Sequence, residues 1–138
     1  MDIVQSVKAR ETAVKESDIE TAVAFYHPQV VMFDVVKDFQ YQGTDALRNR
    51  LSEWLGSLAR VIDFEIQVIH VEEESNLAWC ATKNHIVAET VQGDKLDMWW
   101  RETACYVKDP EKWLIRHVHS SVPFDPATGK ASIALKPS

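Results

Sequence analysis

His117 and His119 are the residues of this sequence best suited to transfer protons, because imidazole ionises near neutral pH. They stand two positions apart in the stretch 113–122, whose β-branched and aromatic residues are typical of a β-strand. Side chains alternate between the two faces of a strand, so both imidazoles point to the same side, together with Ser121. We therefore predict that one surface of this strand carries two histidines and a hydroxyl group.

The preceding stretch 95–108 is also predicted to be a strand, and one of its faces mixes aromatic, charged and hydroxyl side chains. The residues on that face are Trp99, Arg101 and Thr103. A hairpin centred on the short turn between the two strands places His119 roughly opposite Arg101. His117 then lies roughly opposite Thr103. This combination favours a pocket with apolar walls and a few convergent polar groups, although a polar outer sheet face in a dimer contact is an alternative.

Asp34 interrupts the apolar run Val30–Val36. A carboxylate in such surroundings loses hydration, which makes it a better proton acceptor and a candidate general base. A structural role is the alternative, in which Asp34 caps a turn at the end of a strand or pairs with Arg101.

Metal binding and thiol catalysis are two further chemistries, and we expect neither. The two histidines share a face that His85 or Asp34 could complete as a metal site, but no paired carboxylate motif accompanies them. Cys80 and Cys105 lie in apolar stretches, where thiols are usually inert packing groups. The glycines are isolated, so there is no phosphate-binding loop and we expect no cofactor.

The first third of the chain must supply helices that position these groups. Apolar residues recur at helical spacing over 2–15, which predicts a first helix. A capping box that begins at Ser17 opens a second helix, and this helix should stop before Pro28. A third helix follows the break at 43–45 and carries an apolar stripe that ends at Leu58.

The rest of the chain alternates with a period of two and therefore predicts strands. The predicted strands, including two short ones before the third helix, are 30–36, 39–42, 62–71, 77–91, 95–108 and 113–122. The last three exceed the usual five or six residues about twofold, so they must twist and bend. We predict an α+β fold in which a curved antiparallel sheet wraps around N-terminal helices as a cone, with a domain at 1–125 and a tail at 126–138.

Composition limits the partners. The 138 residues include 15 Lys and Arg against 21 Asp and Glu, and this net charge of -6 argues against a nucleic-acid-binding protein. Apolar runs fall far short of the roughly 20 residues that span a bilayer, so we expect no membrane association. The N-terminus does not resemble a signal peptide, and two cysteines fit reduced thiols in a cytoplasmic protein.

Three segments resemble the SnoaL-like branch of the nuclear transport factor 2-like superfamily, which also contains ketosteroid isomerases. They are Val31–Val35 with Tyr41–Ala46, Asp97–Thr103, and Trp113–Asp125, of which the last is the most specific. The resemblance extends over nearly the whole chain and implies an α+β cone around a deep pocket, usually in a homodimer packed through the outer sheet. It also implies that two sets of residues face inward: Trp99, Arg101 and Thr103, and His117, His119 and Ser121.

Function carries over from this resemblance less well than fold does, because the cone hosts several reactions and non-catalytic proteins. Asp34 falls where ketosteroid isomerases keep the carboxylate that shuttles a proton. Those enzymes, a worked example of catalytic acid–base tuning, also use a tyrosine and a protonated aspartic acid. Here the first helix has no tyrosine, the nearest being Tyr26, and the strand that should supply the acid has Arg101, Glu102 and Thr103. These departures argue against steroid isomerisation.

We therefore expect a cofactor-independent acid–base enzyme of isomerase, cyclase or dehydratase type, acting on a small apolar carbonyl compound. Asp34 is the predicted base, and His119 and His117 are the proton donor or orienting groups. Arg101 is the predicted anion stabiliser. The pocket-lining residues expected beside them are Trp99, Thr103, Tyr41, Tyr26 and Ser121. The alternative is a non-catalytic ligand-binding or dimerisation module with the same fold.

Overall fold

The computed structural model describes residues 1–137 and begins with α1 (Ile3–Lys15), close to the predicted helix 2–15. The helix starts at Asp2, whose side chain accepts a hydrogen bond from the Gln5 backbone N–H at 2.8 Å. The Gln5 side chain accepts one from the Asp2 N–H, also at 2.8 Å, so each residue satisfies a free amide of the other.

The second helix, α2 (Ile19–Val23), is shorter than predicted and has a different cap. Asp18, not Ser17, accepts hydrogen bonds from the Thr21 backbone N–H at 3.2 Å and the Thr21 hydroxyl at 2.6 Å. These hydrogen bonds lower the pKa of Asp18, because they favour its ionised form. Ser17 lies in the turn between the helices at a positive φ of 56°.

The first strand, β1 (Tyr26–Phe33), begins before the predicted position at residue 30, so Tyr26 belongs to the sheet and not to the second helix. Tyr26 pairs with Ile115, a residue far away in sequence, and this tertiary pairing outweighs the local helical pattern. Bends follow in residues 34–40, and β2 (Tyr41–Gln42) pairs with the end of β1.

After α3 (Thr44–Gly56) come four long strands, β3 (Leu58–Glu73), β4 (Leu77–Thr90), β5 (Lys95–Lys108) and β6 (Trp113–Ser121). Each pairs antiparallel with the next, as the short connectors predicted. The strand order is β2-β1-β6-β5-β4-β3, and β1 runs parallel to β6. The predicted curved antiparallel sheet therefore contains one parallel pair.

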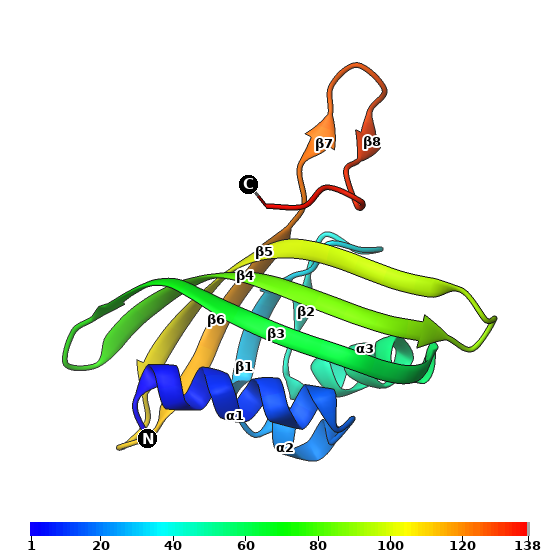
Figure 1. The fold of residues 1–138 in the computed structure, drawn as a ribbon. Helices are drawn as coiled ribbons and strands as arrows, with labels where there is room; N and C mark the ends of the chain where they lie inside the picture. The colour runs from blue at the N-terminus through cyan, green and yellow to red at the C-terminus, as the bar shows by residue number, and fades with distance from the viewer. Residues whose placement is uncertain (138) are drawn as a thin grey trace.

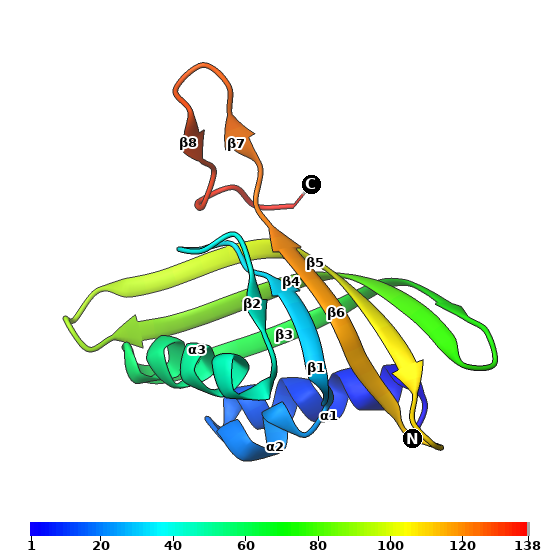
Figure 2. The ribbon, with the colours of Figure 1, turned by 180° about the vertical axis from the view of Figure 1, so that it is seen from behind.

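The sheet curves over the helices, which lie on its concave side (Figures 1 and 2). The predicted α+β cone is therefore confirmed. The core between these layers is made of fully buried side chains from α1, β1, β3, β4, β5 and β6: Val7, Val30, Ile66, Ile86, Tyr106 and Ile115. Within residues 1–137, no helix combines the length and apolar character needed to cross a membrane.

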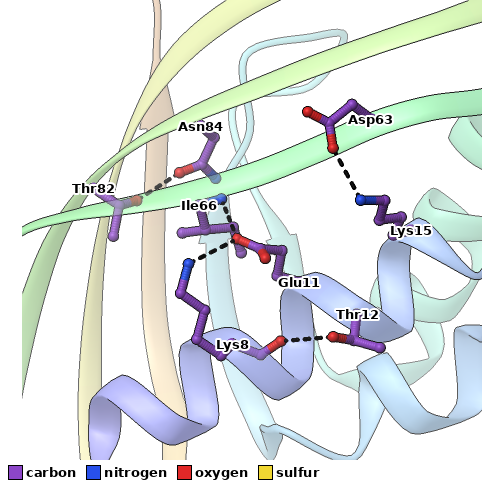
Figure 3. A network of polar contacts seen from close by, with 8 residues as sticks. All are labelled: Lys8, Glu11, Thr12, Lys15, Asp63, Ile66, Thr82 and Asn84. Carbon is purple, nitrogen blue, oxygen red and sulfur yellow. Dashed lines mark hydrogen bonds and ion pairs between the residues drawn. The ribbon is translucent and has the colours of Figure 1, made fainter.

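Polar contacts from α1 hold the free edge of β3, as Figure 3 shows. The Glu11 carboxylate accepts a hydrogen bond from the Ile66 backbone N–H at 2.7 Å. One turn along the helix, the Lys15 ammonium lies 3.0 Å from the Asp63 carboxylate. These contacts occupy polar groups of an edge strand that would otherwise be open to pairing with another chain.

Beyond β6, residues 122–137 form an arm that contains the two-stranded hairpin β7 (Phe124–Asp125) and β8 (Lys130–Ala131). The arm rises on the side of the sheet opposite α1 and α2 in both views (Figures 1 and 2).

Candidate functional site

A cavity of about 200 Å³ lies between the concave face of the sheet and the helices. Its walls are mostly apolar and aromatic, and include Trp54, Phe64, Ile86, Leu96, Met98 and Trp100. The Trp54 and Trp100 rings meet edge to face with centroids 6.0 Å apart. An apolar cavity of about 150 Å³ admits benzene, so this one suits a ligand of about one ring.

The side chains that line the cavity from β5 are the even-numbered ones, Leu96, Met98, Trp100 and Glu102. The prediction that Trp99, Arg101 and Thr103 face inward is therefore wrong. Arg101 and Thr103 are exposed on the outer face, and Trp99 stacks there on His85 with ring centroids 4.1 Å apart. The even-numbered side chains point inward because most of them are apolar and join the core.

A β-bulge explains why His117, His119 and Ser121 also face outward, contrary to the prediction. Tyr106 pairs with Ile115 but Cys105 pairs with His117, so Arg116 is an extra residue in β6. The bulge changes which side successive residues face. Ile115 is consequently buried in the core, whereas His119 is exposed.

The outer histidines pack against Phe33 of β1. The Phe33 ring meets the His117 ring at 4.8 Å and the His119 ring at 5.3 Å between centroids, both edge to face. His117 Nδ1 also lies 2.7 Å from the Val31 carbonyl oxygen. The two histidines and Thr103 share one face, as predicted. The register differs, because His119 pairs with Thr103 and the predicted partner of His119 was Arg101.

Asp34, the predicted base, lies where the cavity opens. It lines the interior cavity and also an open outer depression of about 550 Å³ that residues 33–40 form with His119. One carboxylate oxygen accepts a hydrogen bond from the Val35 N–H at 2.7 Å. The other lies 3.0 Å from Arg50 Nε, so the carboxylate is ion-paired. Of the predicted catalytic residues, Asp34 and His119 thus border the same depression.

A buried ion pair forms a second polar region of the cavity. Arg10 of α1 contacts both carboxylate oxygens of Glu102, with nitrogen–oxygen distances of 3.3 and 3.0 Å. Only 5% of Arg10 and 7% of Glu102 is exposed. Burial alone would lower the pKa of Arg10, but the adjacent Glu102 charge raises it well above its usual value. The Arg10 guanidinium therefore stays charged beside Glu102.

Tyr26 lies beside this ion pair and is hydrogen-bonded to its guanidinium. Arg10 Nη1 donates a hydrogen bond to the Tyr26 hydroxyl at 3.2 Å. Among the described residues, this is the hydrogen bond that the Tyr26 hydroxyl makes, and Tyr26 also lines the cavity. Burial raises the pKa of Tyr26, which keeps the hydroxyl protonated at neutral pH. Of the residues predicted to line a pocket, Tyr26 and Tyr41 lie in the wall of this cavity.

The cavity is also lined by four residues that were not predicted as site residues: Arg10, Arg50, Asn84 and Glu102. A signal exists for Arg10, which occupies the same helical stripe as Ile3, Val7 and Val14. A charged residue within a buried stripe requires a buried partner of opposite charge. Asn84 is fully buried and accepts a hydrogen bond from the Thr82 hydroxyl at 2.6 Å.

The described residues contain no cluster of side chains suited to bind a metal ion. Across residues 1–137, no three His, Cys, Asp or Glu side chains lie close enough together to hold a metal ion. His85, considered as a third ligand, instead lies 2.7 Å from Asp97 on the outer face. That contact lowers the pKa of Asp97, because it stabilises the carboxylate.

Several solved structures share this fold. An NTF2-like protein from Pseudomonas putida KT2440 is 28% identical, with a TM-score of 0.85, covering 98% of this chain and 94% of the other. A ketosteroid isomerase-like protein from Erwinia carotovora atroseptica SCRI1043 is 16% identical, with a TM-score of 0.76, covering 86% of this chain and 92% of the other. An NTF2-like superfamily protein from Salmonella enterica serovar Typhimurium is 17% identical, with a TM-score of 0.75 and 92% coverage of both chains.

Among curated proteins, none matches the sequence. The model of the SnoaL-like domain family matches residues 3–125, which is most of the chain and all of the cone. The chain therefore belongs to the SnoaL-like domain family and is a small-molecule-binding domain of the NTF2-like fold.

Proposed function

We propose that the cavity binds a small, neutral, largely apolar carbonyl compound and that Asp34 acts on it as a general base. The charges that line the cavity support a neutral ligand, because Asp34 is paired with Arg50 and Glu102 with Arg10. The apolar walls and the volume of about 200 Å³ favour a ligand of about one ring.

The position of Asp34 at the mouth of the cavity is the observation that carries the catalytic part of this proposal. In the proposed reaction, the Asp34 carboxylate takes a proton from the carbon next to the ligand carbonyl. The electron pair of the broken C–H bond passes to the carbonyl oxygen, which becomes an enolate. The Tyr26 hydroxyl donates a hydrogen bond to this oxygen, and the Arg10 guanidinium beside it stabilises the negative charge. Protonated Asp34 then returns the proton to carbon.

Two measurements test this proposal. Binding of cyclohexanone or cyclohexenone is followed by the fluorescence of Trp54 and Trp100, which line the cavity. Proton abstraction is followed by NMR as exchange of the α-protons of the ligand in deuterated water. We expect Asp34→Asn to abolish exchange and to preserve binding. Asp94→Asn, an exposed residue of the β4–β5 turn, is the matched control and should leave both unchanged.

The ion pair between Asp34 and Arg50 favours one alternative function, a ligand-binding module without a reaction. In such a module the contact would be structural, because it joins the end of β1 to Arg50 of α3. Binding without exchange by the unmodified protein would support this alternative and contradict the catalytic role. Absence of binding by both ketones would contradict the proposed ligand class.

We also infer that two copies of the chain associate through the outer face of β3–β6. This face measures about 800 Å², from roughly 3.3 Å per residue and 4.8 Å per strand. A typical stable interface covers about 800 Å² on each partner. Exposed Leu77 and Trp79, together with Trp99 stacked on His85, supply apolar area, and small Ala81 and Thr103 allow close approach. Analytical ultracentrifugation at micromolar concentration tests this association.

A further inference from the structure

We propose that the arm, residues 122–137, packs against the flank of a second copy of the chain. This inference rests on the proposed association through the outer face. The arm would add a contact beyond those of the outer face, because it projects away from the sheet (Figures 1 and 2).

The arm has a defined internal structure. Its turn is closed by a hydrogen bond from the Gly129 N–H to the Asp125 carbonyl at 2.7 Å, with Gly129 at a positive φ of 72°. At the base of the hairpin, the Ser132 N–H donates to the Pro123 carbonyl at 2.7 Å. The Asp125 side chain accepts from the Ala127 N–H at 2.9 Å. An isolated two-stranded hairpin is marginally stable in water, so packing against another surface would stabilise the arm.

The arm also exposes large apolar side chains. Phe124 is 66% exposed, Ile133 57% and Leu135 55%. Three such side chains within a short projecting segment form an apolar surface of the kind that marks an interaction site. The body of the same chain does not cover them.

Given the proposed association, the dimensions of the arm place it beside the second copy. Residues 122–127 span at most about 20 Å when extended. Two sheets packed face to face lie only about 10 Å apart, so an arm of this length cannot fit between them. A copy seated on the outer face therefore lies alongside the arm. Twofold symmetry gives each copy one arm to offer and one flank to receive the other.

Part of the arm has a counterpart in the Pseudomonas putida protein. The match to that protein covers 98% of this chain, which leaves fewer residues uncovered than the arm contains.

The test measures the dimer dissociation constant by sedimentation velocity across a concentration series. We compare the full chain with a full-length variant carrying Phe124→Ser, Ile133→Ser and Leu135→Ser. Because a twofold dimer contains each contact twice, the dissociation constant should rise at least about 100-fold. The matched control carries Val4→Ser and Val91→Ser, which are exposed apolar residues on α1 and in the β4–β5 turn, and it should dimerise normally.

A second measurement locates the arm directly. The photoreactive amino acid p-benzoylphenylalanine replaces Phe124 in the full chain, and copies with and without isotope labels are mixed before irradiation. We expect cross-links between labelled and unlabelled peptides. Cross-links confined to one copy, or a triple variant with an unchanged dissociation constant, would overturn the arm contact while the association stands. A full chain that remains monomeric at all concentrations would overturn both proposals.

Discussion

The buried ion pair between Arg10 and Glu102 allows a quantitative test of how the cavity is stabilised. Arg10→Met leaves the Glu102 carboxylate without either of its hydrogen bonds, and Glu102→Met leaves the guanidinium without its carboxylate partner. Removing one partner of a buried pair costs about 3–5 kcal/mol, because the remaining charge stays desolvated. This is a large share of the roughly 5–15 kcal/mol by which a domain is usually stable.

The double variant Arg10→Met, Glu102→Met should lose much less stability than the two single variants combined. Replacing a buried pair by apolar side chains of similar volume is often neutral or stabilising. We expect the double variant to lose at most about 2 kcal/mol. The coupling free energy between the two residues then comes to several kcal/mol.

Urea unfolding followed by tryptophan fluorescence, at fixed protein concentration and neutral pH, gives these free energies. The control is the exposed pair of Arg48 and Glu20, whose Nε–Oε1 distance of 2.6 Å is shorter than any contact of the buried pair. Arg48→Met should cost much less than Arg10→Met, because water screens exposed charges. If Arg10→Met costs no more than Arg48→Met, or if the two buried single variants add independently, the reasoning is refuted.

Two further predictions concern the bulge and a surface ion pair. Ile115→Ala should destabilise the protein by about 2–5 kcal/mol, whereas His117→Ala should cost at most about 1.5 kcal/mol, and similar losses in thermal unfolding would contradict the bulge. The hydrogen bond between Lys15 and Asp63 raises the pKa of Lys15 and lowers the pKa of Asp63. This ion pair should therefore contribute fully to folding stability between the unfolded-state pKa values of Asp and Lys, about 4 and 10.4. The contribution should disappear as the pH falls through the lowered pKa of Asp63 or rises through the raised pKa of Lys15, and it should weaken in salt. A Lys15→Ala effect that is independent of pH and salt would contradict this assignment.

The layers of the fold could be predicted because they depend on local periodicity. The change from a helical to an alternating pattern after residue 58 separated helices from strands, and short connectors indicated antiparallel pairing. The early part of β1 could not be recognised in this way. Its pairing with Ile115 joins segments that are distant in sequence, and nothing local around Tyr26 indicates that partner.

The candidate site could be predicted only in part, for a related reason. Asp34 and Tyr26 were chosen from local signals, an acid in an apolar run and a nearby tyrosine, and both line the cavity. The inner face of β5 was assigned wrongly because Glu102 looks like a surface residue until Arg10 is placed against it. That partner lies 92 positions away in the sequence. The bulge at Arg116 adds one residue without any Gly or Pro to mark it.

The bulge at Arg116 also separates the two surfaces on which the proposed functions depend. With unbroken alternation, Ile115 and His117 would share a side, and either an imidazole would enter the core or an isoleucine would leave it. The extra residue lets β6 bury Ile115 and still present both histidines outside. Those histidines contact the ring of Phe33, the residue directly before Asp34. Phe33 ends β1 and Asp34 follows it directly, so a second copy that covered the histidines would contact the immediate surroundings of the proposed base.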